Sequence, residues 1–215
     1  MKSTMNKLAL KKSTARFAFC LLLLTASIVH AHAQSSLQLG IKAGGDYMKI
    51  GGRSFDGKHY PGFVAGLYGQ LNFTSKWSLQ PELIWNQTIG KTSADFNQLY
   101  GGVSFQQVIL NYAALPVLVV YKPVPQLSLL LGPQYGFLVQ QTQGLLPLEP
   151  GVNAFKKSDL SIVFGGQLNL GKVIFGVRYS AGLNNISYRS TDAWRQYGFN
   201  AYVGYQFKDI KLKKK

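Results

Sequence analysis

The sequence predicts an all-β protein, an eight-stranded antiparallel up-and-down β-barrel that spans a membrane. Three observations lead to this prediction. Apolar and polar side chains alternate in about eight segments, short and long connections between these segments alternate, and aromatic residues lie at the ends of the apolar faces. Outer-membrane barrels are built in this way, with apolar side chains toward lipid, polar ones toward the lumen and aromatic girdles at both interfaces.

The segment 77–85 shows the alternation most clearly. Its apolar face carries Trp77, Leu79, Pro81, Leu83 and Trp85. Its other face carries Ser78, Gln80, Glu82, Ile84 and then Asn86. The two tryptophans are on the order of 20 Å apart along the axis of a barrel whose strands are tilted by about 40°. This distance is close to the height of the apolar band of an outer-membrane barrel, so we expect Glu82 to face the lumen.

The same alternation recurs along the rest of the chain, over residues 37–48, 60–73, 105–121, 126–140, 158–170, 172–183 and 196–207. The segment 105–121 is nearly all apolar, so the sequence leaves open which of its faces points outward. Short connections (74–76, 122–125 and 169–172) alternate with long ones (50–59, 89–104, 142–157 and 184–195). Short periplasmic turns and long outer loops are the rule in these barrels. An even strand count then places both termini in the periplasm.

The first 33 residues have the features of a cleaved secretory signal peptide. A lysine- and arginine-rich start precedes a short apolar run, 17–29, and the sequence Ala31-His32-Ala33 is a small-x-small cleavage site. The apolar run is too short to span a bilayer, although a retained anchor helix is the alternative. We therefore expect a barrel domain at 34–207 and a basic periplasmic tail at 208–215. The single cysteine, Cys20, lies inside the signal, which excludes a disulfide framework in the mature chain.

Composition narrows the class of protein further. The whole chain has a net charge of +15, yet only 14% of its residues are charged. A basic tail can indicate nucleic-acid binding, but an exported protein rarely meets nucleic acid, so we expect no such partner. Anionic headgroups of the lipid bilayer and of lipopolysaccharide are the better partners. A soluble lipocalin-like barrel is the competing fold, but it requires a polar exterior.

The candidate site residues fall into two groups. The first is a lumen charge network formed by Lys42, Glu82, Asp159 and Arg178. Isolated buried charges are costly, so we expect Glu82 to pair with Arg178 or Lys42, and a proton or ion path is the alternative. The second is an interface girdle formed by Trp77, Trp85, Tyr135, Tyr179, Tyr205 and Phe207. Pro81, Pro116 and Pro133 fall inside expected strands, where we expect bulges or strand ends near the rim.

No catalytic, cofactor or metal site is expected. Ser54, Asp56 and His59 lie in one connection and could form a lipid-hydrolysing group, but Asp56-Gly57 is more typical of a turn. His59 is the only histidine after the signal, so no histidine-rich metal site can form. The long connections carry basic and aromatic residues, which could bind lipopolysaccharide phosphates or a partner protein, or could form an ordinary interfacial girdle.

The segments also resemble the PorT-type outer-membrane β-barrel family. The resemblance rests on short motifs in order along the chain, which are Leu39-Gly40-Ile41-Lys42-Ala43-Gly44, Gly62-Phe63-Val64-Ala65-Gly66, Leu79-Gln80-Pro81-Glu82-Leu83, Leu115-Pro116-Val117-Leu118, Gly132-Pro133-Gln134-Tyr135-Gly136, Arg178-Tyr179-Ser180-Ala181-Gly182-Leu183 and Gly204-Tyr205-Gln206-Phe207. It implies an eight-stranded barrel of diverse or unassigned function and supplies no catalytic residues; the family name comes from a link to protein secretion. It also implies that the three prolines belong to the family pattern.

We therefore expect an integral protein of the cell outer membrane that is not an enzyme and has a structural or accessory role, with a possible link to secretion or surface assembly. A barrel whose outer loops bind a ligand, as an adhesin does, is the alternative, and a lipid-modifying barrel enzyme is a third. Expected partners are the outer-membrane insertion machinery, for which Phe207 would be the terminal aromatic signal, and an envelope or secretion protein.

Overall fold

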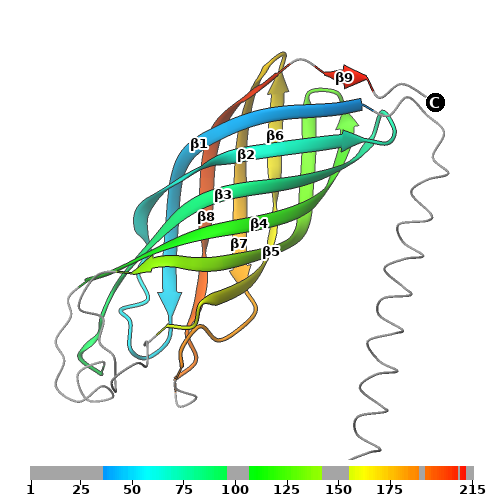
Figure 1. Cartoon of the computed structure of the whole chain (residues 1–215). Helices are drawn as coiled ribbons and strands as arrows, with labels where there is room; N and C mark the ends of the chain where they lie inside the picture. Colours follow the sequence, from blue (N-terminus) through cyan, green and yellow to red (C-terminus); the bar gives the residue numbers. More distant parts are fainter. Residues whose placement is uncertain (1–35, 96–106, 142–154, 189–191, 208, 212–215) are drawn as a thin grey trace, which may run out of the picture.

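The computed structural model describes residues 36–95, 107–141, 155–188, 192–207 and 209–211. The expected signal peptide, 1–33, lies outside these residues. The strands are β1 (Ser36–Gly51), β2 (Tyr60–Asn72), β3 (Trp77–Lys91), β4 (Gln107–Val124), β5 (Leu127–Gln141), β6 (Ser158–Leu170), β7 (Val173–Gly182), β8 (Arg195–Gln206) and the short β9 (Ile210–Lys211). Each of the first eight pairs antiparallel with the next, and β8 pairs with β1, which closes an eight-stranded barrel (Figure 1). No helix in the described part of the chain is long and apolar enough to cross a membrane.

The register of the strands fixes the tilt of the barrel. A row of paired residues runs once around it, through Leu37, Leu71, Leu79, Val119, Leu131, Phe164, Tyr179, Phe199 and Tyr47. The row leaves β1 at Leu37 and returns to it at Tyr47, ten residues further along the strand. With eight strands, this stagger corresponds to a strand tilt of about 40° and an interior just wide enough for side chains to fill.

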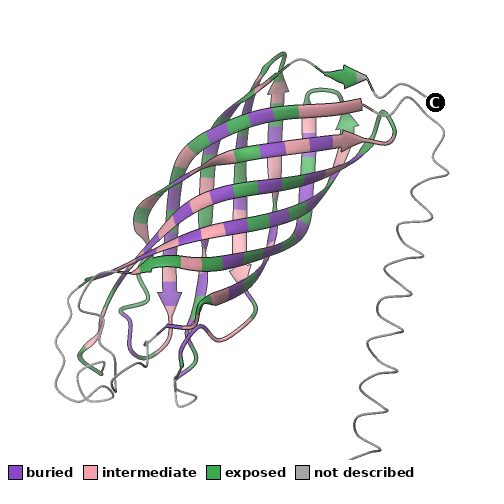
Figure 2. Cartoon of the chain, in the orientation of Figure 1, coloured by how far each residue is buried: buried purple, intermediate pink, exposed green. Residues whose placement is uncertain are grey.

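Burial alternates along every long strand, as the period of two requires (Figure 2). The alternation places the charged and amide side chains of β1, β3, β6, β7 and β8 in the lumen and leaves large apolar side chains outside. The structure also resolves the open orientation of β4. Leu110, Tyr112 and Leu118 point inward, whereas Leu115 and Val117 point outward. One wall of the lumen is therefore apolar.

The connections follow the expected alternation. At one end of the barrel, which we call the turn end, neighbouring strands are joined by the short connections 73–76, 125–126 and 171–172. At the opposite end, which we call the loop end, they are joined by the long connections 52–59, 92–106, 142–157 and 183–194. Figure 1 shows the loop end at the lower left and the turn end, with β9, at the upper right. The chain alternates between the two ends because each strand simply returns beside the last.

The expectation of bulges or strand ends at the prolines is wrong. Pro81 pairs with Val117 and Pro133 with Ile162 inside long strands, and the register shifts between β4 and β5 lie elsewhere, at Asn111/Tyr112 and near the turn after Tyr121. The pairing instead skips positions beside the prolines while the register continues across them. Each proline lacks one N–H group, and the neighbouring hydrogen bonds hold the strand in place.

Part of the expected basic tail belongs to the sheet. Ile210 and Lys211 form β9, which pairs with Leu37 and Ser36 at the start of β1. Just before β9, Phe207 N donates a hydrogen bond to Leu39 O at 2.8 Å, which keeps this part of the chain beside β1. Since β8 ends at Gln206, opposite Gly40, the first residues of β1 would lack a neighbour on this side without β9. Residues 210–211 of the expected tail thus extend the sheet beside β1, and the limits of the tail stay a prediction.

Candidate functional site in the barrel lumen

The centre of the lumen holds an ion-pair layer formed by Lys42, Glu82 and Arg178. Arg178 donates two parallel hydrogen bonds to Glu82, from Nη1 to Oε2 at 2.8 Å and from Nη2 to Oε1 at 2.9 Å. Lys42 Nζ donates to the same Oε2, and Gln80 Nε2 donates to Oε1 at 2.7 Å. All three charged side chains are buried. Every oxygen of the carboxylate is therefore satisfied, which offsets the cost of removing these charges from water.

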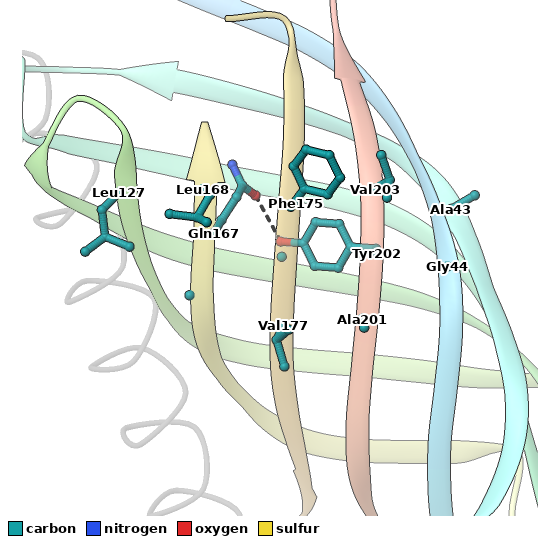
Figure 3. A pocket seen from close by; sticks show the side chains of 12 residues that line it. Ala43, Gly44, Leu127, Gln167, Leu168, Phe175, Val177, Ala201, Tyr202 and Val203 are labelled. Carbon is teal, nitrogen blue, oxygen red and sulfur yellow. Dashed lines mark hydrogen bonds between the residues drawn. The ribbon is translucent and has the colours of Figure 1, made fainter. Parts of the chain in front are cut away.

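Two tyrosines complete this layer. The ring of Tyr202 lies 4.7 Å from Lys42 Nζ and 4.6 Å from Arg178 Cζ, so both cations face its π system. Its hydroxyl donates to Gln167 Oε1 at 2.9 Å, a bond that Figure 3 shows. Inward-facing glycines make room for the rings: a Cβ on Gly176 would lie 2.2 Å from Tyr202 Cζ, and one on Gly40 would lie 2.4 Å from Tyr68 Cζ.

The fourth expected member of the charge network, Asp159, stands apart from the ion-pair layer. It is buried on the inward face of β6, as expected, but it forms no ion pair among the described residues. A second lumen carboxylate, Asp46, was missed by sequence reasoning, although it lies on the same face of β1 as Lys42 and four residues further on. The period of two could have identified it.

The lumen below the ion-pair layer, toward the turn end, is filled by an amide and hydroxyl network. Gln70 Nε2 donates to Asn72 Oδ1 at 2.7 Å, and Ser78 Oγ donates to the same oxygen at 2.6 Å. Lys122 Nζ also donates to it, at 3.0 Å. Over the described residues, the interior of the barrel consists of stacked polar and apolar layers, because eight strands bring the side chains of all walls into contact.

A loop cap covers the loop end of the lumen. We use this name for the buried cluster of Ile50, Phe55, Val108, Leu110, Tyr112, Phe155, Ile186 and Trp194. Three of its four aromatic members come from three different connections, and the ring of Trp194 lies 5.1 Å from Phe55 and 4.9 Å from Phe155. These segments fold inward over the barrel because they bury apolar rings against the inner face of β4.

Asp192 ties the loop cap together. It accepts hydrogen bonds from Arg53 N at 3.1 Å, from Ser54 N at 2.9 Å, from Ser54 Oγ at 2.6 Å and from Trp194 Nε1 at 2.9 Å. Burial by itself would raise the pKa of Asp192, but the hydrogen bonds from Ser54, Trp194 and Arg53 outweigh it and hold the pKa below the usual range of an aspartate. Sequence reasoning missed this link because nothing local pairs Asp192 with Ser54.

The three residues considered for lipid hydrolysis engage other groups. Ser54 is buried and bonds to Asp192. Asp56 accepts hydrogen bonds from Lys58 N at 3.1 Å and from the Tyr60 hydroxyl, which is turn chemistry. The His59 ring stacks on Tyr47 with 5.3 Å between the centroids. Among the described residues, no contact of these three with one another forms a nucleophile–base pair.

The six residues of the expected girdle occupy the outer surface. Trp77 at the start of β3 packs against Tyr121 at 4.7 Å, and Tyr205 and Phe207 lie together at the end of β8, 5.9 Å apart. These three mark the turn end. Tyr135 and Tyr179 lie further along their strands, in edge contact with Phe137 and Phe199, and Trp85 lies half-buried between Ala65 and Ala113. Their role at the membrane interfaces stays a prediction.

The outer wall carries an apolar hollow of about 550 Å³ (Figure 3). It lies over β6, β7, β8 and β1, where the small residues Gly166, Ala201 and Ala43 alternate with larger side chains such as Phe175 and Val203. Within the described residues, no group of three His, Cys, Asp or Glu side chains is placed to hold a metal ion. Among the described residues, the buried charged side chains of the strands lie in the lumen.

Comparison with models of protein families agrees with this architecture. Residues 32–188 match the family model described as outer membrane protein beta-barrel domain. Solved structures similar to the chain include Ail of Yersinia pestis in complex with the heparin analogue sucrose octasulfate, with 15% identity, a TM-score of 0.44 and coverage of 81% of this chain and 100% of that one. Neisserial surface protein A has 13% identity, a TM-score of 0.45 and coverage of 81% and 100%. OprG from Pseudomonas aeruginosa has 14% identity, a TM-score of 0.43 and coverage of 81% and 96%.

The search of curated proteins gives no match. The family model nevertheless covers well over half of the chain, and it agrees with a closed antiparallel barrel that presents apolar side chains on its outer surface. The protein belongs to the outer membrane protein beta-barrel domain family and resides in the outer membrane.

Proposed function

We propose that this protein is a non-enzymatic barrel with a closed lumen and a structural or accessory role in the cell envelope, with a link to protein secretion or surface assembly. The single observation that carries the proposal is the obstruction of the lumen at successive levels. The ion-pair layer of Lys42, Glu82 and Arg178 crosses its centre, and the loop cap covers its loop end. A barrel obstructed in this way acts through its surfaces rather than as a diffusion pore.

The proposal includes the orientation and the domain limits expected from the sequence. The long connections face the outside of the cell, both termini lie in the periplasm, and a signal peptide, 1–33, is removed. The PorT-type resemblance adds the link to secretion, and Phe207 is read by the insertion machinery. The short turns 73–76 and 171–172 support the orientation, because periplasmic turns of these barrels are short.

Site-specific crosslinking tests the proposed role. The mature chain contains no cysteine if the signal is removed at the expected site, so single cysteines can be placed at will. Lys58→Cys labels an exposed tip at the loop end, and Lys76→Cys labels an exposed turn at the other end. A photo-crosslinker on one of them should capture an envelope or secretion protein in intact cells. Capture of lipid alone from both positions would contradict the accessory role.

A specific observation also favours the second candidate, a barrel whose outer loops bind a ligand. Exposed cations collect at the loop end, at Arg53, Lys58, Lys91, Lys157 and Arg195. Lys91 Nζ lies 5.2 Å from the centroid of the Tyr60 ring, which shows basic and aromatic side chains side by side. Such a surface suits the phosphates of lipopolysaccharide.

The two candidates are distinguished by replacing surface charge alone. The double variant Lys91→Gln/Arg195→Gln should weaken the binding of purified lipopolysaccharide to the detergent-folded barrel if the rim binds it. Lys76→Gln/Lys172→Gln is the matched control, because it removes the same charge from the turn end. Equal binding by both variants would leave the rim without a ligand-binding role.

A further inference from the structure

The apolar hollow on the outer wall has a floor of mostly small side chains (Figure 3). The strand register places Gly166, Val177, Ala201 and Gly45 in one row across β6, β7, β8 and β1. The first three of these residues line the hollow of about 550 Å³. Because glycine and alanine cover the backbone so little, the outer surface is lowest along this row.

Larger side chains border the floor on both sides. The next row toward the loop end holds Phe164, Tyr179 and Phe199, whose rings lie 5.4 and 4.8 Å apart and form a continuous ridge. The next row toward the turn end holds the outward-facing Leu168, Phe175 and Val203. The hollow is therefore a groove that follows the row of small residues across four strands.

The groove begins near the turn end and leads toward the middle of the wall. On β6, Gly166 lies four residues from Leu170, where the strand ends. On β1, Gly45 lies nine residues from Ser36, where that strand begins. At the rise of a strand, these positions are about 13 and about 30 Å along the strand from the turn end. Leu127, the first residue of β5, also lines the hollow.

A cation lies on the outer surface where the groove begins. Lys172 is exposed in the connection between β6 and β7, three residues before Phe175. Its Nζ lies 6.0 Å from the centroid of the Tyr205 ring, which faces outward on β8. The ammonium group therefore lies on the lipid side of the barrel rather than in the lumen. A cation beside an aromatic ring at the edge of an apolar surface is typical of the membrane interface.

We propose that the groove binds one acyl chain of a glycerophospholipid whose phosphate contacts Lys172. The cation at the turn end and the apolar groove behind it follow the order in which a phospholipid presents its phosphate and its chain. The chain would lie along the floor at Val177 and Ala201. The choice of a phospholipid over lipid A rests on the proposed orientation, which places the turn end at the periplasmic leaflet.

Native mass spectrometry tests this site by counting bound lipids. The mature chain is refolded in a non-ionic detergent, and phosphatidylglycerol, whose phosphate is its only charged group, is added in small molar excess. We expect a complex with one lipid that persists after the detergent has been removed. Lipid A is added in a parallel titration and should bind more weakly.

Two pairs of variants locate the bound lipid. Ala201→Phe places a ring on the floor of the groove, and each methylene that the ring displaces should weaken binding about fourfold. Val117→Phe is the matched control, because it adds the same ring to the outward face of β4 on the opposite wall. Lys172→Gln should weaken binding about fivefold, whereas Lys76→Gln, which removes an exposed lysine from another turn at the same end, should not.

Heat-modifiable gel migration shows whether each variant has folded, and Ala43→Phe replaces Ala201→Phe if that variant does not fold. Absence of a retained lipid on the wild-type barrel, or equal binding by the wild type and a folded groove variant, would overturn the proposal. So would tighter binding of lipid A, or a dimer of the wild-type barrel that Ala201→Phe dissociates, because the occupant would then be different. These outcomes are independent of crosslinking in cells, which tests the envelope role.

Discussion

Arg178 and Glu82 form a two-point ion pair between opposite walls of the barrel, with N–O distances of 2.8 and 2.9 Å. Arg178 belongs to β7 and Glu82 to β3, and four steps separate these strands in either direction around the eight-stranded ring. The pair therefore crosses the lumen rather than following one wall. Lys42 joins it from β1, so the layer connects three strands across the lumen.

The first prediction concerns removal of the central carboxylate. In Glu82→Gln, the buried side chains of Lys42 and Arg178 lose their only ion-pair partner among the described residues. Breaking a buried pair in this way costs about 3–5 kcal/mol, because the remaining charges stay out of water. Denaturant unfolding of the folded barrel, followed by gel migration, should show this loss of stability.

Two comparisons make the Glu82→Gln result specific. Asp56→Asn removes a carboxylate from an exposed loop and should unfold at the wild-type denaturant concentration. The triple variant Lys42→Met/Glu82→Gln/Arg178→Met removes the charges together and should recover part of the loss, because no unpaired charge is left. An unchanged midpoint for Glu82→Gln would show that the pair contributes nothing to stability.

The second prediction concerns the space that glycine leaves for Tyr202. In Gly176→Ala, the new Cβ would lie 2.2 Å from Tyr202 Cζ, so the ring must move away from Lys42 and Arg178. Overpacking of this kind costs about 1–3 kcal/mol. Gly166→Ala is the matched control, since its Cβ would have nothing closer than Ser128 O at 4.0 Å. Equal unfolding midpoints for the two variants would mean that Tyr202 has room to move.

The sequence was sufficient for the fold because a strand has a period of two. The alternation around Glu82 and Arg178 identified the lumen side, and the strict order of short and long connections identified a closed up-and-down barrel. The same rule reduced the partners of Glu82 to Lys42 and Arg178. It could not show that Asp159 stands apart, because contacts across the lumen depend on the stagger of the whole barrel, which closes between Leu37 and Tyr47.

The loop cap was beyond sequence reasoning for a different reason. Ser54 and Asp192 are 138 residues apart in connections without any hydrophobic period. Only the closed barrel brings the ends of β1 and β8 together, and with them the segments that carry these two residues. The β4 orientation was likewise undetermined, because both faces of this strand are apolar: one packs in the lumen and the other faces outward. In both cases the missing information is tertiary.

The third prediction is a pH dependence of the loop cap. The pKa of Asp192 is lower in the folded cap than in an unfolded segment, so the carboxylate stabilises the cap above the ordinary aspartate pKa of about 4. This contribution is lost as the pH falls through the lowered value in the folded state. The cap should therefore loosen only in acid below about pH 4, while the barrel remains folded.

The fluorescence of Trp194 reports this transition. Trp77→Phe/Trp85→Phe leaves Trp194 as the only tryptophan of the chain, and its indole donates directly to Asp192. Asp192→Asn in the same background should lose the acid transition and show the emission of a looser cap at neutral pH. If the Trp194 fluorescence of Asp192→Asn followed the same pH profile as that of the background protein, the acid transition would belong to another group.

The fourth prediction concerns the obstruction of the lumen, and it follows from the layered interior. Trp194 is the largest fully buried side chain and contacts Phe55 and Phe155 within the cap. Trp194→Ala removes the ring that joins these segments, at a cost of about 3–5 kcal/mol to the local packing. In Trp194→Ala, we expect proteases to cleave the loops more rapidly. We expect no stable channel in planar bilayers, because the ion-pair layer still crosses the lumen. Trp194→Ala combined with Lys42→Ala/Glu82→Ala/Arg178→Ala removes two obstructions and should show more channel openings than Trp194→Ala, although the amide and hydroxyl network toward the turn end still fills the lumen. Conductance by Trp194→Ala alone would show that the cap, and not the ion-pair layer, closes the barrel.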